Sequence, residues 1–150
     1  MPSASPPKET LEQTVDRFWE TIPPLWSMIR SHIRAVATEK FGITVEQFHV
    51  LRYVRRGTGS VSELATAKNI SRPAISQAVD VLVNKGLLTR TQSRQDRRFV
   101  DLALTPAGNE LLDTVFKETR DWMKSHMTTF NAGELDNVMK AMDSLKKMLE

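Results

Sequence analysis

The polar side of residues 71–84 carries side chains that can bind the edges of base pairs. Arg72, Ser76, Gln77 and Asp80 recur at helical spacing, opposite a side made of apolar residues. In the major groove of a duplex, arginine suits guanine and glutamine suits adenine. We therefore expect Arg72 and Gln77 to contact bases, with contact to phosphate alone as the alternative for Arg72.

Two short helices are needed to position these side chains. Ser71 is the expected N-cap of the second helix, and it is also a candidate phosphate contact. A first helix is expected from Ser60 to Lys68, where the Ser60 hydroxyl and the Glu63 carboxylate would each accept a backbone N–H of the other residue. Asn69 suits the left-handed stop between the helices. This pattern predicts a helix-turn-helix, whose second helix reaches bases with its N-terminal residues, including Ser76.

A basic loop follows, between two segments that read as short strands. Leu88 and Arg90 lie in the first segment, and Val100, Leu102 and Leu104 lie in the second. The loop holds the wing candidates for DNA contact, which are Arg94, Asp96, Arg97 and Arg98. A hairpin with arginines at its tip, next to a helix-turn-helix, is a winged helix whose tip reaches phosphates or a minor groove. Alternatively, one arginine pairs with Asp96 and shapes the loop.

Positive charge is concentrated in the middle of the chain. Residues 50–100 contain ten Lys or Arg and three Asp or Glu, which gives +7, whereas the whole chain has a net charge of +3 and the remainder therefore −4. A positive centre between acidic arms favours a polyanionic partner, namely double-stranded DNA. The alternative is an ordinary solvated basic surface.

Other kinds of chemistry find little support. The chain has no Cys, which excludes disulfides, thiolate catalysis and cysteine-based sensing. His32, His49 and His126 are far apart and lack metal-ligand spacing. We therefore expect no metal, no cofactor and no enzyme activity. No apolar run approaches the ~20 residues that a membrane span needs, and the N-terminus lacks a signal-peptide core, so we expect a cytoplasmic protein without a membrane partner.

The terminal parts of the chain read as helices. Residues 1–9 are expected to be a flexible tail, and the following helical pattern should break or kink sharply at Pro23 and Pro24 before it ends near Gly42. Thr44, with a glutamine at the third helical position, predicts a helix that ends near Gly57. After the hairpin, Thr105 and Asn131 are the expected N-caps of two more helices.

The apolar stripes of these terminal helices exceed what a small winged helix can cover. A second copy of the chain would bury them, and two recognition helices could then read a palindrome about one helical turn (~34 Å) apart. The alternative is that the terminal helices pack only on their own domain.

Taken together, these motifs resemble the MarR family of bacterial transcription regulators. The resemblance covers roughly residues 10–150 and is carried by VSELA at 61–65, SRPAIS at 71–76, KGLL at 85–88, DRR at 96–98 and LALTPAG at 102–108. The turn departs from the pattern, because Asn69-Ile70 stands where many members have glycine and a leucine.

The resemblance implies a homodimer with interlocked terminal helices. It also implies a pseudo-palindromic operator, repression, and release of DNA by a small, often aromatic acid that binds between the dimerisation and DNA-binding parts. Asp96 and Arg98 match the wing motif of the family, whose arginine enters the minor groove. Candidate residues for an effector pocket are Trp19, Trp26, Phe48 and His49, although aromatic residues at helical spacing often form core or a dimer seam.

We therefore expect a mainly α protein with a small β-wing: a winged helix-turn-helix with long terminal dimerisation helices. Residues 10–150 would form a single domain of MarR type, with a DNA-binding part at 45–105 and dimerisation helices at 10–44 and 106–150. The expected function is that of a homodimeric repressor released by a small-molecule effector. The alternatives are a winged-helix interaction module for an acidic partner and a metal-responsive regulator.

Overall fold

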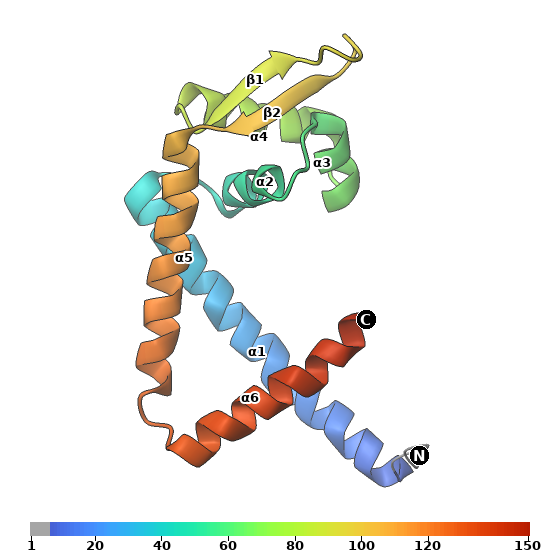
Figure 1. The fold of residues 1–150 in the computed structure, drawn as a ribbon, viewed down its shortest axis with the longest axis vertical. Helices are drawn as coiled ribbons and strands as arrows, with labels where there is room; N and C mark the ends of the chain where they lie inside the picture. The colour runs from blue at the N-terminus through green and yellow to red at the C-terminus, as the bar shows by residue number, and fades with distance from the viewer. Residues whose placement is uncertain (1–6) are drawn as a thin grey trace. The chain divides into compact units, whose positions relative to one another are not determined.

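A computed structural model describes residues 7–150 as helices with one small sheet (Figure 1). In chain order the elements are α1 Lys8–Phe41, α2 Val45–Arg55, α3 Val61–Lys68, α4 Arg72–Asn84, β1 Leu88–Gln92, β2 Val100–Leu104, α5 Pro106–Met127, α6 Ala132–Lys146 and the 3-10 turn η1 Lys147–Leu149. This confirms the mainly α class with a β-wing. The chain divides into two compact units, with the boundary after Phe116.

Helix α1 differs from the prediction in where it begins and in its course at Pro23 and Pro24. It begins at Lys8, so Lys8 and Glu9 are helical rather than part of a tail; residues 1–6 lie outside the described residues. The helix also continues through Pro23 and Pro24, so the predicted break is wrong. Two adjacent prolines remove only two backbone donors, and the exposed surroundings let water bind the freed carbonyl groups. The helix ends, as expected, at Gly42 with φ 59°.

The core of the first unit lies between α2, α3, α4 and the start of α5. Phe48, Leu51, Leu64, Val79 and Leu82 are each 0% exposed. At ~1.5–3 kcal/mol for each fully buried large apolar side chain, these residues dominate the stability of the helix-turn-helix. They fix the inner face of α4 and leave its polar side outward.

The N-cap of α3 forms only half of the predicted reciprocal pair. The Ser60 hydroxyl accepts from the Glu63 N–H at 3.1 Å, but the Glu63 carboxylate accepts from the Gly59 N–H at 3.1 Å instead of from Ser60. Ser60 itself pairs with Asp101 in an isolated antiparallel bridge, which joins this cap to the hairpin. Asn69 ends the helix with φ 50°, as predicted.

The start of α4 also differs from the prediction. Ser71 occupies the N-cap position, but its side chain makes no capping hydrogen bond. The hydroxyl of an N-cap serine binds the N–H of the second or third helical residue. The second residue here, Pro73, has no N–H, and the Ser71 side chain does not bind that of the third residue, Ala74, either. The Ser71 hydroxyl is therefore available to a partner outside the chain.

The predicted hairpin is confirmed. Strands β1 and β2 are antiparallel, with Leu88 opposite Leu104 and Arg90 opposite Leu102. Figure 1 shows the two strands beside α3 and α4, and both β1 with α4 and β2 with α3 are in contact. Residues 93–99 form the tip.

One threonine joins the end of α4 to the start of α5. The Thr105 hydroxyl donates to the carbonyl oxygen of Gly86 at 2.6 Å and accepts from the N–H of Gly108 at 3.0 Å. A Cβ at Gly108 would lie 2.2 Å from the carbonyl oxygen of Leu87, so only glycine fits there.

The second unit ends in an amphipathic helix. Asn131 and Glu134 form the predicted capping box, with backbone-to-side-chain bonds of 2.8 and 3.0 Å. Leu135, Met139 and Met142 of α6 are 39%, 67% and 49% exposed. None of the described helices is long and apolar enough to cross a membrane.

Candidate nucleic-acid interface

Helix α4 presents the predicted polar side to solvent. Arg72 and Gln77 are exposed and Ser76 is half-buried, whereas Ile75 and Val79 on the opposite side are buried. A helix with this division offers long polar side chains to a groove while its apolar side holds it on the domain.

The structure brings two of the predicted contacts together. Arg72 from the start of α4 and Arg98 from the wing line one hollow of about 210 Å³. Arg90 of β1 lines the same hollow, although the sequence did not single it out as a contact residue. The recognition helix and the wing therefore share one basic surface.

Arg90 ties the wing to the recognition helix. Its Nη1 donates to Asp80 Oδ1 at 2.5 Å and its Nη2 donates to Ser76 Oγ at 3.1 Å. Asp80 is an acidic residue on the polar side of α4, but no local pattern in the sequence links it to Arg90. Ser76, a predicted DNA contact, is therefore also part of this internal bond network.

In the wing tip, Arg98 is the arginine that pairs with Asp96. Nε and Nη2 of Arg98 both donate to the Asp96 carboxylate, and the Arg98 backbone N–H donates to Asp96 Oδ1 at 3.0 Å. These bonds hold the pKa of Asp96 below its usual range and raise the pKa of Arg98. The Arg98 side chain is nevertheless 87% exposed. The other two predicted wing arginines, Arg94 and Arg97, are exposed as well.

The four candidate effector residues have very different surroundings. Phe48 is fully buried in the core. Trp19 is 66% exposed and packs edge-on against Phe18. Trp26 lines a hollow of about 430 Å³ on α1, together with Arg30 and Arg34, and neither Phe48 nor His49 lines this hollow.

His49 lies in a partly buried, positively charged environment. Burial lowers its pKa from 6.5 to about 4, and the charges of Lys68, Arg52 and Arg30 act in the same direction. The neighbouring Arg52 guanidinium lies 5.6 Å from the ring centre of Phe116, and burial lowers the pKa of Arg52 too. This environment disfavours a protonated histidine.

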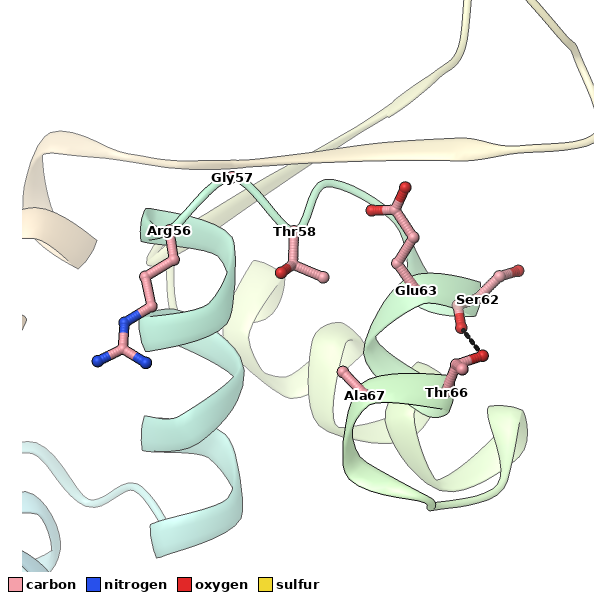
Figure 2. Close-up of a pocket in the computed structure, with 7 residues that line it drawn as sticks. All are labelled: Arg56, Gly57, Thr58, Ser62, Glu63, Thr66 and Ala67. Atoms are coloured by element: carbon pink, nitrogen blue, oxygen red, sulfur yellow. Dashed lines mark hydrogen bonds between the residues drawn. The ribbon is translucent and has the colours of Figure 1, made fainter. Parts of the chain in front are cut away.

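A third hollow, of about 570 Å³, lies between the end of α2 and α3 (Figure 2). Three of its seven lining residues, Thr58, Ser62 and Thr66, have short polar side chains, and Thr66 donates to the Ser62 carbonyl oxygen at 3.0 Å. The Arg56 guanidinium extends away from Glu63, so their charges do not meet across the hollow. Arg55, also at the end of α2, donates to Asp113 of α5 at 2.6 Å. We assign no site to this hollow.

No group of three His, Asp or Glu side chains that could hold a metal ion occurs within residues 7–150.

Helices α3 and α4, the hairpin beside them and their shared basic surface define a winged helix-turn-helix protein.

Comparison with known proteins relates this architecture to MarR-type regulators. The MarR family model matches residues 41–98. The HTH-type transcriptional repressor MdtR of Bacillus subtilis is 31% identical over 98 residues, which is 65% of this chain and 63% of MdtR, less than two thirds of that repressor. The chain is thus similar to MarR-type transcriptional regulators, and the family model itself matches less than half of its length.

Solved structures support the fold over nearly the whole chain. The transcriptional regulator Tm0710 of Thermotoga maritima has a TM-score of 0.79 at 22% identity, covering 89% of this chain and 94% of Tm0710. A mutant of the S. aureus protein MepR, bound to an oligodeoxyribonucleotide, has a TM-score of 0.69 at 19% identity, covering 89% of this chain and 98% of MepR.

Proposed function

We propose that this protein is a homodimeric repressor that binds a pseudo-palindromic operator through α4 and the wing, and that a small ligand releases it. The observation that carries the proposal is the shared hollow: Arg72 of α4 and Arg98 of the wing line it together, with Gln77 exposed on the same helix. Such a surface fits a major groove and the phosphates beside it.

Base reading falls to the start of α4. Arg72 and Gln77 are its long exposed polar side chains, and the free hydroxyl of Ser71 suits a phosphate. Arg94, Arg97 and Arg98 supply the wing contacts, with Asp96 orienting Arg98. The +7 charge of residues 50–100 supports attraction of the whole surface to DNA in the cytoplasm.

Dimerisation is supported by exposed apolar residues near both ends of the chain. Leu11 and Trp19 of α1 are 54% and 66% exposed, and Met139 of α6 is 67% exposed. Large apolar side chains repeated along a helix face favour burial against a second copy. In sedimentation velocity, we expect a dimer for the wild type and a monomer with weak DNA affinity for Met139→Glu.

The ligand class is supported by the hollow on α1. An aromatic ring (Trp26) next to two guanidinium groups (Arg30 and Arg34) suits the ring and the carboxylate of an aromatic acid. Benzoate should therefore quench the fluorescence of the wild type more than that of Trp26→Leu, and it should release bound operator.

Selection from random duplexes tests the DNA-binding proposal. We expect one palindromic motif for the wild type and a relaxed preference at one position of each half-site for Gln77→Ala, because a bidentate contact contributes ~1–3 kcal/mol of discrimination. Gln13→Ala, on exposed α1, should select the wild-type motif. Binding that shows no preference for duplex DNA over an acidic peptide would instead favour a protein-interaction module.

A further inference from the structure

The hollow between the wing and the two helices of the helix-turn-helix has a composition suited to one anion. Three arginines, Arg72, Arg90 and Arg98, line its volume of about 210 Å³, and Ser60 and Ser62 add two hydroxyl groups. A Lys or Arg cluster on an open surface is ordinary, but three arginines from three different elements around one small hollow are a specific arrangement.

Two of the three guanidinium groups are held in place by carboxylates and still have donors to spare. Arg90 uses Nη1 for Asp80 and Nη2 for Ser76, which leaves part of its five N–H groups free. Arg98 binds Asp96 through Nε and Nη2, which leaves Nη1. Both groups are therefore oriented before any ligand arrives.

The electrostatic balance of the hollow favours a single negative charge. Asp80 and Asp96 offset two of the arginines, and the positive charge of Arg72 remains. A phosphodiester carries one negative charge and two non-bridging oxygens that accept charge-assisted hydrogen bonds. The exposure of Arg98, at 87%, leaves the hollow open to a polymer rather than enclosed around a free ion.

We propose that Arg72, Arg90 and Arg98 together bind one phosphodiester group of the DNA backbone in each half-site, and that Asp80 and Ser76 position Arg90 for this contact. Arg72 then makes the phosphate contact that the sequence left open as its alternative, and base reading falls to Gln77. The assignment rests on the proposed DNA-binding function and adds a residue, Arg90, and a ligand group to it. We call these three arginines the phosphate seat. Because they come from α4, β1 and the wing tip, a phosphate bound to them would hold the wing in place relative to α4.

The salt dependence of DNA affinity measures this contact. Each neutralised phosphate contributes a slope of about −0.9 in the logarithm of the association constant against the logarithm of the salt concentration, so Arg90→Gln should make the slope of a dimer less steep by about 1.8. Arg120→Gln removes the same charge from an exposed position on α5 and should leave the slope unchanged. Arg90→Lys keeps the charge without the two-pronged bond, so it should weaken binding but keep the wild-type slope.

A purely structural role for Arg90 makes a different prediction. If Arg90 only braces the wing, Asp80→Asn and Arg90→Gln should weaken binding equally and neither should change the slope. Under the proposal, Asp80→Asn retains the guanidinium and hence the slope. Thermal unfolding of each variant identifies those that have lost the fold.

Neutral methylphosphonate linkages, placed one at a time along the selected duplex, locate the phosphate. We expect one position in each half-site at which the neutral linkage weakens the wild type but has no effect on Arg90→Gln. The scan is also informative with the wild type alone. If no neutral linkage weakens binding of the wild type, the proposal is overturned even if Arg90→Gln fails to fold.

The remaining outcomes separate the inference from the proposed function. Wild-type protein that binds duplex DNA, with the same slope and the same sensitive positions in Arg90→Gln, overturns the phosphate seat alone. Wild-type protein without duplex affinity overturns both. Calorimetry with inorganic phosphate should show binding far weaker than that of the duplex. Tight phosphate binding, abolished in Arg90→Gln while duplex affinity is retained, would assign the hollow to a free anion instead.

Discussion

The Arg98 guanidinium and the Asp96 carboxylate, two residues apart at the wing tip, are joined through Nη2 at 2.9 Å and Nε at 3.1 Å. The carboxylate also accepts from the Arg98 backbone N–H. Asp96 thus fixes both the backbone and the side-chain direction of the wing arginine. An acidic residue, which by charge alone would repel DNA, serves here to orient a cation.

Replacement of Asp96 by asparagine should therefore separate specific from non-specific binding. Asp96→Asn removes a negative charge, so affinity for random duplexes should not fall, but the ratio of operator to random affinity should fall roughly tenfold because Arg98 is no longer oriented. Both Kd values are measured at one fixed salt concentration. Asp143→Asn on exposed α6 is the charge-matched control, and equal gains for both duplexes in Asp96→Asn would contradict an orienting role.

Gly108 should tolerate no side chain. In Gly108→Ala the new Cβ would meet the Leu87 carbonyl oxygen at 2.2 Å, which is backbone and cannot move aside cheaply. We expect a loss of about 2–3 kcal/mol in the free energy of unfolding, measured with urea. The matched control is Gly59→Ala, because a Cβ at Gly59 has no neighbour within 4 Å. Similar stabilities for the two variants would show that the backbone at the junction of β2 and α5 can shift to make room for a Cβ.

The two N-cap serines should differ in their contribution to stability. Ser60→Ala removes the bond to the Glu63 N–H and should cost about 1 kcal/mol. Ser71 makes no capping bond, so Ser71→Ala should change the free energy of unfolding by less than about 0.5 kcal/mol. Chemical denaturation of both variants without DNA checks this order, and a larger loss for Ser71→Ala would reverse it.

Stability should fall in acid because of His49. Its pKa is about 4 in the folded chain and 6.5 as the ordinary value, so between these pH values the unfolded chain binds the additional proton. The stabilising contribution is complete above pH 6.5 and is lost as the pH falls towards 4. Because part of the side chain meets water, we expect only about 1 kcal/mol.

The measurement for His49 is a comparison of variants. The free energy of unfolding is measured with urea at about pH 7 and about pH 4.5. Its decrease between the two pH values should be smaller by about 1 kcal/mol in His49→Gln than in the wild type. His126→Gln, at an exposed histidine, is the control. Identical losses in the wild type and His49→Gln would show that other groups carry the acid sensitivity.

The sequence predicted the elements whose signals are local. The helix boundaries at Gly42, Asn69 and Asn131 follow from left-handed stops and caps that involve neighbouring residues only. The hairpin follows from its alternation and its basic tip. Of the predicted break or kink at Pro23 and Pro24, the break was wrong, because the effect of proline depends on whether the freed carbonyl groups can reach water, which is a property of the surroundings.

Candidate site residues could be chosen from the sequence where their exposure on one helix was enough, but not where distant segments meet. Gln77 and Arg72 could be chosen from the polar side of α4 alone. The role of Arg90 depends on its distance to Asp80, ten residues away in another element, and the sequence contains no pattern for that pair. The four effector candidates could not be grouped reliably, because helical spacing does not distinguish the buried Phe48 from the exposed Trp19.

The hydroxyl of Thr105 binds the residue just beyond the end of α4 and the first turn of α5 at the same time. The end of α4 and the beginning of α5 are therefore connected through one side chain. Because the one hydroxyl group makes both hydrogen bonds, a displacement of the first turn of α5 would strain the bond to the Gly86 carbonyl oxygen unless the residues after α4 moved with it.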